Sequence, residues 1–308
     1  MDQSRRKFLV NGSLTIAGSM FLSNSIFAES NAVKTRLGVQ LYSVRDDMKK
    51  NPLGTLKKIS AMGYKNVEHA NYSNRKFYGY SASEFKKILN GLGLKMPSGH
   101  TVMSDKHWDN TTNDFTDEWK YTIEDAVTAG QKHVISPYMA ESLRKDYDGL
   151  LAFMDKFNKC GELCKKSGVK FGYHNHEFEF RDSLNGKKLF DIILENTDPE
   201  LVIQQLDTGN MHGAGARAID VIKKYPKRFE SMHVKDQIKA PGKGKGEMEG
   251  NFESTILGKG LLPMKQIIDL AKKIGGTTDF IVEQESYQGK TPLACIKEDL
   301  IIMKGWGY

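Results

Sequence analysis

The chain has 308 residues, of which 39% are hydrophobic and 27% charged, a composition typical of a globular protein. This composition excludes a disordered, collagen-like or polytopic membrane protein. The formal net charge is +7, but the 45 basic and 38 acidic residues are scattered without a block of one sign, so we expect no nucleic-acid partner.

The first 28 residues follow the order of an export signal. A basic start that contains Arg5 and Arg6 precedes a mildly apolar stretch with Gly and Ser, which ends near Ala28. This order resembles the twin-arginine type of signal and predicts a periplasmic or otherwise exported protein, with residues 29–308 as the mature chain. The alternative is a frayed cytoplasmic N-terminus. Polar residues interrupt the stretch too often for a membrane anchor, so we expect no stable membrane insertion of the mature chain.

From Arg36 onward, the sequence alternates eight times between a short apolar run and a segment of helical periodicity. The predicted strands are residues 37–41, 66–68, 95–100, 133–136, 170–174, 202–207, 230–234 and 279–283. The predicted helices are residues 52–62, 82–92, 115–129, 142–167, 189–196, 218–225, 263–274 and 292–304. Glycine follows five of these helices, as a left-handed C-cap requires: Gly63, Gly93, Gly130, Gly168 and Gly275.

Strand and helix in strict alternation imply parallel strands joined by crossovers. Eight such units favour a closed (β/α)8 TIM barrel, that is, a parallel eight-stranded barrel, over an open doubly wound sheet. No Gly-rich dinucleotide or phosphate loop follows the first predicted strand, which disfavours the Rossmann alternative. No linker or change of composition interrupts the mature chain, so we expect residues 29–308 to form one domain.

Three cysteines are too few for a disulfide framework. Cys160 and Cys164 lie on consecutive turns of one predicted helix, and the odd number leaves at least one thiol unpaired. A zinc site built on cysteine is therefore not expected, and any metal would use histidine and carboxylate ligands.

Side chains suited to chemistry gather where the predicted strands end, which is where a TIM barrel presents its functional groups. They are Glu68 and His69, His100, His174 with His176 and Glu177, Asp207 with Asn210 and His212, His233 with Lys235 and Asp236, and Glu283 with Glu285. A single histidine at a strand end is more often a hydrogen-bonded rim residue. Histidines and acids that converge on one barrel mouth would repel or desolvate one another unless a cation holds them. We therefore predict one divalent metal ion (Mn, Mg, Co, Zn or Fe) with nitrogen and oxygen ligands.

Over residues 36–308 the sequence resembles the xylose-isomerase-like family of TIM barrels, which includes sugar isomerases, epimerases and related lyases. The resemblance rests on the eightfold alternation and on the segments HNHEFEF at 174–180, LDTGN at 206–210, HVKD at 233–236 and VE at 282–283. It implies one metal ion held by ligands on strands five to eight, typically Glu, Asp, His and Glu. The last three correspond to Asp207, His233 and Glu283. The first falls on His174, where imidazole replaces the usual carboxylate.

The change at His174 bears on the expected mechanism. In the epimerases of the family, two metal-bound glutamates face opposite sides of the substrate carbon, whereas a metal-bound neutral imidazole is a poor base. Glu283 is then the expected base, and the second group would come from His176, Glu177, Glu179, Glu68 or His100. We expect only one of His174 and His176 to be a ligand. An alternative places Glu177 and Glu179 on a solvated loop edge.

The remaining polar residues at the strand ends are assigned to substrate. We expect Lys235 to stabilise the charge of the intermediate, with a structural ion pair to Asp236 as the alternative. The expected substrate-binding residues are Glu68, His100, Asn210 and Asp236. Aromatic residues that could stack on a sugar are Tyr42, Tyr72, Trp108 and Tyr138. The long connection at 237–260 is interpreted as a lid over the substrate or as a mobile surface loop.

The resemblance implies a metal-dependent sugar isomerase or epimerase that acts on a keto-sugar by proton abstraction and an enediolate intermediate. The alternative is a lyase or dehydratase of a 3-keto-sugar or keto-glycoside, because one base and one acid suffice for elimination. A non-catalytic carbohydrate-binding barrel is a further alternative. An abasic-site endonuclease is disfavoured by the dispersed charge. The expected partner is a small carbohydrate, unphosphorylated if the protein is exported, and a homo-oligomer is left open.

Overall fold

Eight parallel strands close into a barrel in the computed structural model, which describes residues 35–240, 242 and 251–308. The predicted export signal lies outside these residues. The barrel strands are β1 (Arg36–Gln40), β2 (Asn66–His69), β6 (Lys95–His100), β9 (His133–Ser136), β10 (Lys170–His174), β13 (Val202–Asp207), β14 (Ser231–Val234) and β17 (Asp279–Val282). β1 pairs with both β2 and β17, which completes the ring. The predicted (β/α)8 TIM barrel is therefore confirmed.

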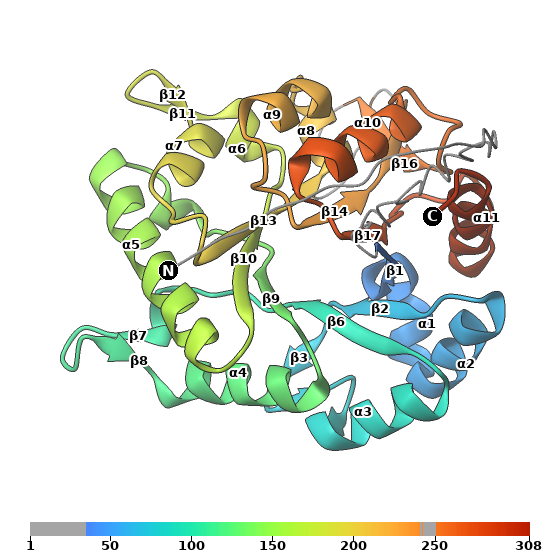
Figure 1. Ribbon diagram of the computed structural model, residues 1–308, viewed down its shortest axis with the longest axis horizontal. Helices are drawn as coiled ribbons and strands as arrows, with labels where there is room; N and C mark the ends of the chain where they lie inside the picture. Colours follow the sequence, from blue (N-terminus) through green and yellow to red (C-terminus); the bar gives the residue numbers. More distant parts are fainter. Residues whose placement is uncertain (1–34, 241, 243–250) are drawn as a thin grey trace, which may run out of the picture. The chain divides into compact units, whose positions relative to one another are not determined.

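Helices follow the barrel strands and lie outside the ring (Figure 1). The main ones are α2 (Pro52–Met62), α3 (Ala82–Gly91), α4 (Asp117–Ala129), α5 (Tyr147–Lys166), α7 (Leu189–Glu195), α9 (Ala218–Lys224), α10 (Met264–Leu270) and α11 (Pro292–Gly305). Shorter helices are α1 (Arg45–Lys50), α6 (Phe178–Arg181) and α8 (Thr208–Gly213). Within the described residues, no helix has the length and apolar character needed to cross a lipid bilayer.

Three features of the helices differ from the predictions for local reasons. α4 starts two residues later than predicted because β8 (Asp114–Phe115) pairs with β7 (Trp108–Asp109) in a hairpin. α5 starts at Tyr147 because the Asp146 carboxylate accepts a hydrogen bond from the Gly149 amide at 2.8 Å and caps the helix there. Gly275 is not the left-handed residue after α10. A π turn over Ala271–Gly275 continues the helix, and Gly276 has the positive φ of 84°.

The connection after β14 contains a hairpin, whereas we predicted a long loop. β15 (Asp236–Lys239) pairs antiparallel with β16 (Phe252–Thr255). A smaller three-stranded sheet, β3 (Tyr72–Ser73), β4 (Lys76–Phe77) and β5 (Tyr80–Ser81), follows β2. These insertions lie beyond the carboxyl ends of their barrel strands, so they belong to the functional face of the barrel.

Strand alternation directs the polar residues into the barrel. On β10, Phe171 and Tyr173 pack against Phe157 of α5, with ring centroids 5.0 and 5.5 Å apart. Since neighbouring residues of a strand face opposite sides, His174 points to the interior. Large apolar clusters fill the space between the barrel and its helices, and strand residues such as Leu206, Met232 and Phe280 contribute to them.

Candidate metal centre and active site

The same alternation directs a set of donors into the open end of the barrel. On β13, β14 and β17, the apolar residues Leu206, Met232 and Val282 belong to the outer core. The residues next to them, Asp207, His233 and Glu283, therefore face inward. Asp207 and His233 are also direct partners across β13 and β14. Three residues from distant parts of the sequence thus meet because neighbouring strands end at the same height.

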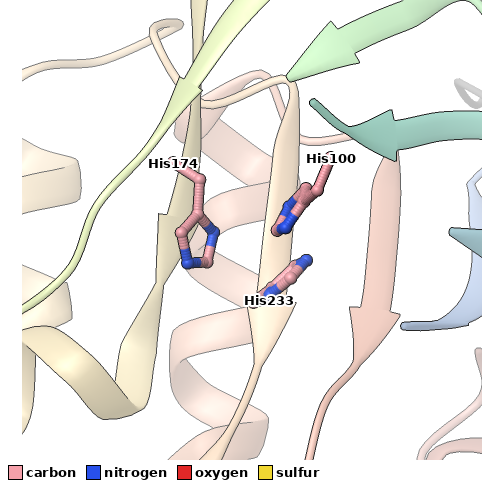
Figure 2. Close-up of side chains that lie close together, drawn as sticks. All are labelled: His100, His174 and His233. Carbon is pink, nitrogen blue, oxygen red and sulfur yellow. The ribbon is translucent and has the colours of Figure 1, made fainter. Parts of the chain in front are cut away.

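Two overlapping groups of donor atoms have the composition of a metal site. Asp207, His233 and Glu283 form one group, and His100, His174 and His233 form the other, with the donor atoms in each group within 4.8 Å of one another. Figure 2 shows the three imidazole rings of the second group close together. Mixed imidazole and carboxylate donors suit a divalent cation such as Zn, Mn, Co or Fe. The four residues expected as ligands therefore come together, and His100, expected to bind substrate, lies beside them.

His233 is held between two carboxylates. Its Nε2 lies 2.6 Å from Oε1 of Glu68, and its Nδ1 lies 2.9 Å from Oε2 of Glu283. Burial opposes the charged form of His233, but Glu283 and Glu68 raise its pKa to about 10. Burial also opposes ionisation of Glu68, yet His100 and His233 lower its pKa to about 2. With Nε2 fixed by Glu68, Nδ1 faces Glu283 and Asp207, the side on which the donors converge.

Gln205 links the histidines and was not among our predicted residues. Its Oε1 lies 2.7 Å from Nε2 of His100 and 3.0 Å from Nδ1 of His174. Its amide nitrogen donates to Oε2 of Glu68 at 2.8 Å and to Oγ of Ser231 at 3.0 Å. These two acceptors fix the orientation of the Gln205 amide, so its carbonyl oxygen accepts a hydrogen bond from Nδ1 of His174. Nε2 of His174 then carries no proton, and its lone pair is available to a metal ion. The position of Gln205, two residues before Asp207 on an inward-facing strand, is the signal that could have identified it.

Lys235 lies fully buried among three carboxylates. Its Nζ is 3.0 Å from Oδ2 of Asp207, 2.8 Å from Oε2 of Glu283 and 2.6 Å from Oε1 of Glu285. It also donates to Oδ1 of Asn210 at 3.2 Å. Lys235 therefore pairs with the candidate ligands Asp207 and Glu283. Burial opposes ionisation of Glu283, but Lys235 and His233 keep its pKa well below the usual value.

Asp236 has a structural position, although we expected it to bind substrate. It is fully buried, and its carboxylate accepts hydrogen bonds from four backbone amides at 2.8–3.1 Å, those of Gln237, Gly258, Gly260 and Leu262. Glu68, also expected to bind substrate, is fully buried and is occupied by His233, Gln205, Gln40 and Ser98. Asn210 is buried, its side-chain oxygen accepts from Lys235, and its backbone N–H donates to Oδ1 of Asp207 at 2.7 Å. These three residues support the cluster and the loop beside it.

The segment after β10 carries three other predicted residues, and none of them belongs to the two donor groups. The imidazole of His176 stacks on Phe178 and faces Tyr138, and it is not among the donors of the cluster. Glu177 is half-buried at the start of α6. Glu179 is fully buried, where its carboxylate accepts from the Tyr173 hydroxyl and from the His176 amide. The alternative of a solvated edge is therefore wrong for Glu179, and burial raises its pKa to about 7.

A cavity of about 860 Å³ opens over the cluster. His100, His174, His176 and Glu283 line its inner end, and residues of the β3 segment, of the loop after β6 and of α4 line the remainder. Tyr42 and Tyr72 are part of the wall, as expected for sugar-stacking residues. Trp108 and Tyr138, the other two residues expected to stack, are not in this lining. Trp108 is buried in its hairpin.

The charge of the cluster fits a divalent cation. Four acidic side chains belong to it, those of Glu68, Asp207, Glu283 and Glu285, whereas the cationic groups placed against them are Lys235 and, with its raised pKa, His233. Buried carboxylates in excess of cations are costly unless a positive charge offsets them. Asp207, His233, Glu283 and His174 are the residues that would hold such an ion.

A sequence model described as the xylose isomerase-like TIM barrel matches residues 56–305. Among curated proteins, an inosose dehydratase from Clostridium beijerinckii is 23% identical over 290 residues, which cover 84% of this chain and 89% of that enzyme. An inosose dehydratase from Geobacillus thermodenitrificans is 26% identical over 139 residues, which cover 43% of this chain and 46% of that enzyme. The second alignment thus spans less than half of that relative.

Solved structures with the same fold carry names of related activities. A sugar phosphate isomerase/epimerase from Parabacteroides distasonis has a TM-score of 0.72 and 25% identity, with 88% of this chain and 98% of that one covered. A protein named IOLI, whose structure holds a zinc atom, has a TM-score of 0.64 and 15% identity, with 88% and 97% covered. At that identity, the second likeness shows the fold alone.

Proposed function

The chain belongs to the xylose isomerase-like TIM barrel family, and from this premise we propose that it is a divalent-metal-dependent lyase or dehydratase of a keto-sugar. The observation that carries the proposal is the pair of overlapping donor groups, Asp207, His233 and Glu283 with His100, His174 and His233, of which His100, His174 and Glu283 line the cavity. Relatives named inosose dehydratase support elimination as the outcome over isomerisation.

The chemistry follows from the arrangement of side chains around the cavity. A bound divalent cation would polarise the substrate carbonyl and make the neighbouring C–H more acidic. Glu283 lies on the cavity wall and is held ionised by Lys235 and His233, so it is the candidate base. Lys235, which pairs with Glu283, would stabilise the negative charge that develops on the intermediate. His176 lines the cavity near His174 and is the candidate acid for the leaving group.

The cavity wall holds the groups that elimination needs. Epimerisation needs a base or acid on each face of the same carbon. Among the described residues that line the cavity, Glu283 and Glu118 are the carboxylates, and Glu118 lies on α4, where it pairs with Lys106 and lies 3.7 Å from Nε2 of His107. At the inner end, Glu283 would provide the base and His176 the acid, and one base and one acid are enough for elimination.

A sugar isomerase or epimerase is the second candidate. It is supported by the likeness to the Parabacteroides protein of that name, which covers almost all of both chains. Both reactions start with proton removal by Glu283, so they differ only in the steps after the proton is removed.

The test is proton exchange in heavy water, followed by NMR, with a panel of ketoses, 3-keto-glycosides and inososes and with added Mn²⁺. We expect loss of the C–H signal next to the carbonyl together with a new alkene or enone signal. Exchange without an alkene would favour the isomerase or epimerase. Glu283→Gln should abolish exchange, whereas Glu298→Gln, at a half-buried position outside the cavity lining, should leave it unchanged. Full exchange in Glu283→Gln would remove Glu283 from the mechanism.

We also propose that the protein is exported through its twin-arginine signal, which is supported by the sequence around Arg5 and Arg6. Replacing both arginines with lysine should retain the protein in the cytoplasmic fraction. Unchanged distribution between cytoplasmic and exported fractions would contradict this assignment.

A further inference from the structure

We infer that the cavity has two parts and that its outer part binds a second, uncharged ring of a substrate larger than a monosaccharide. The inference rests on the proposed function only in taking the inner part as the site of reaction. The inner part is the histidine end of the cavity. The outer part is the region lined by Tyr72, Arg75, Lys106, Glu118 and Tyr121.

The size of the cavity is the first argument. Pockets of roughly 300–1,000 Å³ enclose drug-sized ligands, so the volume of about 860 Å³ lies near the upper end of that range. One sugar ring at Glu283 and His176 would leave the outer part empty. That part is formed by insertions after two barrel strands, β2 and β6, together with α4, so it is a built extension of the barrel mouth.

The aromatic surface of the outer part is held in place by a network of contacts. Tyr121 is 41% exposed, and the Arg75 guanidinium lies 4.3 Å from its ring centroid. Arg75 is itself fixed by Asp125, with Nε to Oδ2 at 3.0 Å and Nη2 to Oδ1 at 2.8 Å. The Tyr72 hydroxyl donates to the same carboxylate at 2.7 Å. A ring held on a rigid support offers a stacking surface at little entropic cost to the ligand.

The charges of the outer part are already paired. Arg75 and Lys106 are the arginine and lysine in the described lining, and each lies 2.8 Å from a carboxylate, Asp125 and Glu118 respectively. A phosphate group would have to displace these acids. The rest of the outer wall offers neutral hydroxyl and amide groups, from Asn71, Ser73, Asn74, Thr101, Ser104 and Thr122. This chemistry suits an uncharged ring with polar edges, namely a second sugar or an aryl group joined by a glycosidic bond, and it disfavours a sugar phosphate.

The test is calorimetric titration of the Mn²⁺-loaded protein with four non-reacting probes: glucose, cellobiose, phenyl β-glucoside and glucose 6-phosphate. We expect cellobiose or phenyl β-glucoside to bind at least tenfold more tightly than glucose, and glucose 6-phosphate to bind no better than glucose. Preference for cellobiose would identify the second ring as a sugar, and preference for the phenyl glycoside would identify an aryl group. Equal binding, no binding of either two-ring probe, or tightest binding of glucose 6-phosphate would overturn the inference.

Variants test whether the preference for two-ring probes over glucose comes from the outer part. Tyr121→Ala should remove the tenfold preference without changing the affinity for glucose, and Tyr121→Phe should retain it. Val127→Ala, on the same helix and at 39% exposure, is the matched control and should behave as the wild type. A preference that survives Tyr121→Ala would contradict the assignment. These probes do not react, so their binding does not depend on the proposed reaction. Tight binding of a two-ring probe without any proton exchange in heavy water would overturn the proposed function but support the inference about the outer part.

Discussion

Gln205 shows how one neutral side chain orders a charged site. It accepts from His100 and His174 and donates to Glu68, which in turn holds His233. The orientation of all three imidazoles therefore depends on one amide. Gln205 is not among the candidate ligands, so its effect is to set the direction in which the histidine lone pairs point.

We predict that Gln205→Leu weakens Mn²⁺ binding by about 10- to 100-fold, the usual effect of removing a residue that orients metal ligands. The measurement is isothermal titration of the metal-free protein. Gln204→Leu is the matched control on the same strand, because Gln204 is buried with no hydrogen-bond partner for its amide among the described residues and lies outside the cluster. Wild-type affinity in Gln205→Leu would show that the histidines are oriented without it.

Asp299 of α11 is a buried acid outside the candidate metal centre. It accepts a hydrogen bond from the Leu257 amide at 2.9 Å, and burial raises its pKa to about 7. The unfolded chain ionises this group near pH 4. Between about pH 4 and 7 the folded state therefore binds more protons than the unfolded state, so this group makes the protein less stable as the pH rises.

We predict that Asp299→Asn removes this pH dependence and raises the free energy of unfolding at pH 8 by on the order of 2 kcal/mol. Urea denaturation at pH 5 and pH 8 measures both effects. Asp155→Asn, at an exposed position of α5, serves as the control. Parallel pH curves for the wild type and Asp299→Asn would refute the prediction.

At the scale of elements, the loops at the open end of the barrel depend on buried anchors. Asp236, the first residue of β15, accepts from four backbone amides, three of which lie in the segment 258–262 that leads into α10. A Cβ added at Gly260 would lie 2.2 Å from Oδ1 of Asp236, so a glycine is required for this close approach. The hairpin and the following helix are thereby fixed relative to β14.

We predict that Asp236→Ala lowers the free energy of unfolding by about 2–4 kcal/mol, because it leaves several buried amides without an acceptor. Asp236→Asn should cost less, since its carbonyl oxygen retains part of the acceptor capacity. Chemical denaturation provides the measurement. A variant with wild-type stability and a raised KM would instead support the original expectation that Asp236 binds substrate.

At the scale of the whole molecule, the candidate ligands all come from one half of the barrel. They come from the ends of β10, β13, β14 and β17, which are consecutive in the ring. An ion bound by all four would favour the folded state, because the unfolded chain does not hold these groups together.

We predict that Mn²⁺ raises the melting temperature by several degrees, since a ligand at 100 times its Kd adds about 2.7 kcal/mol. A chelator should reverse the shift, and Glu283→Gln should reduce it. Differential scanning fluorimetry over a series of metal concentrations is suitable. A melting temperature that is independent of metal would count against the proposed site.

The sequence alone determined the barrel and the position of its candidate ligands along the chain. Alternation of apolar runs with helical segments is a local signal, and parallel strands must end at the same edge, so Asp207, His233 and Glu283 could be placed together without coordinates. The predicted strand boundaries agree with the structure to within one residue, because each strand is bounded by turn residues that are visible locally.

Only the tertiary structure decided what each polar side chain at the barrel mouth contacts. Lys235 and Asp236 are neighbours in the sequence, yet one joins the carboxylates of the site and the other holds a loop. Glu179 is buried against the Tyr173 hydroxyl, and Gln205 contacts two histidines of the site. The physical reason is that a buried polar atom takes whichever partner the packing brings within hydrogen-bonding distance, and those partners here lie on strands far apart in the chain.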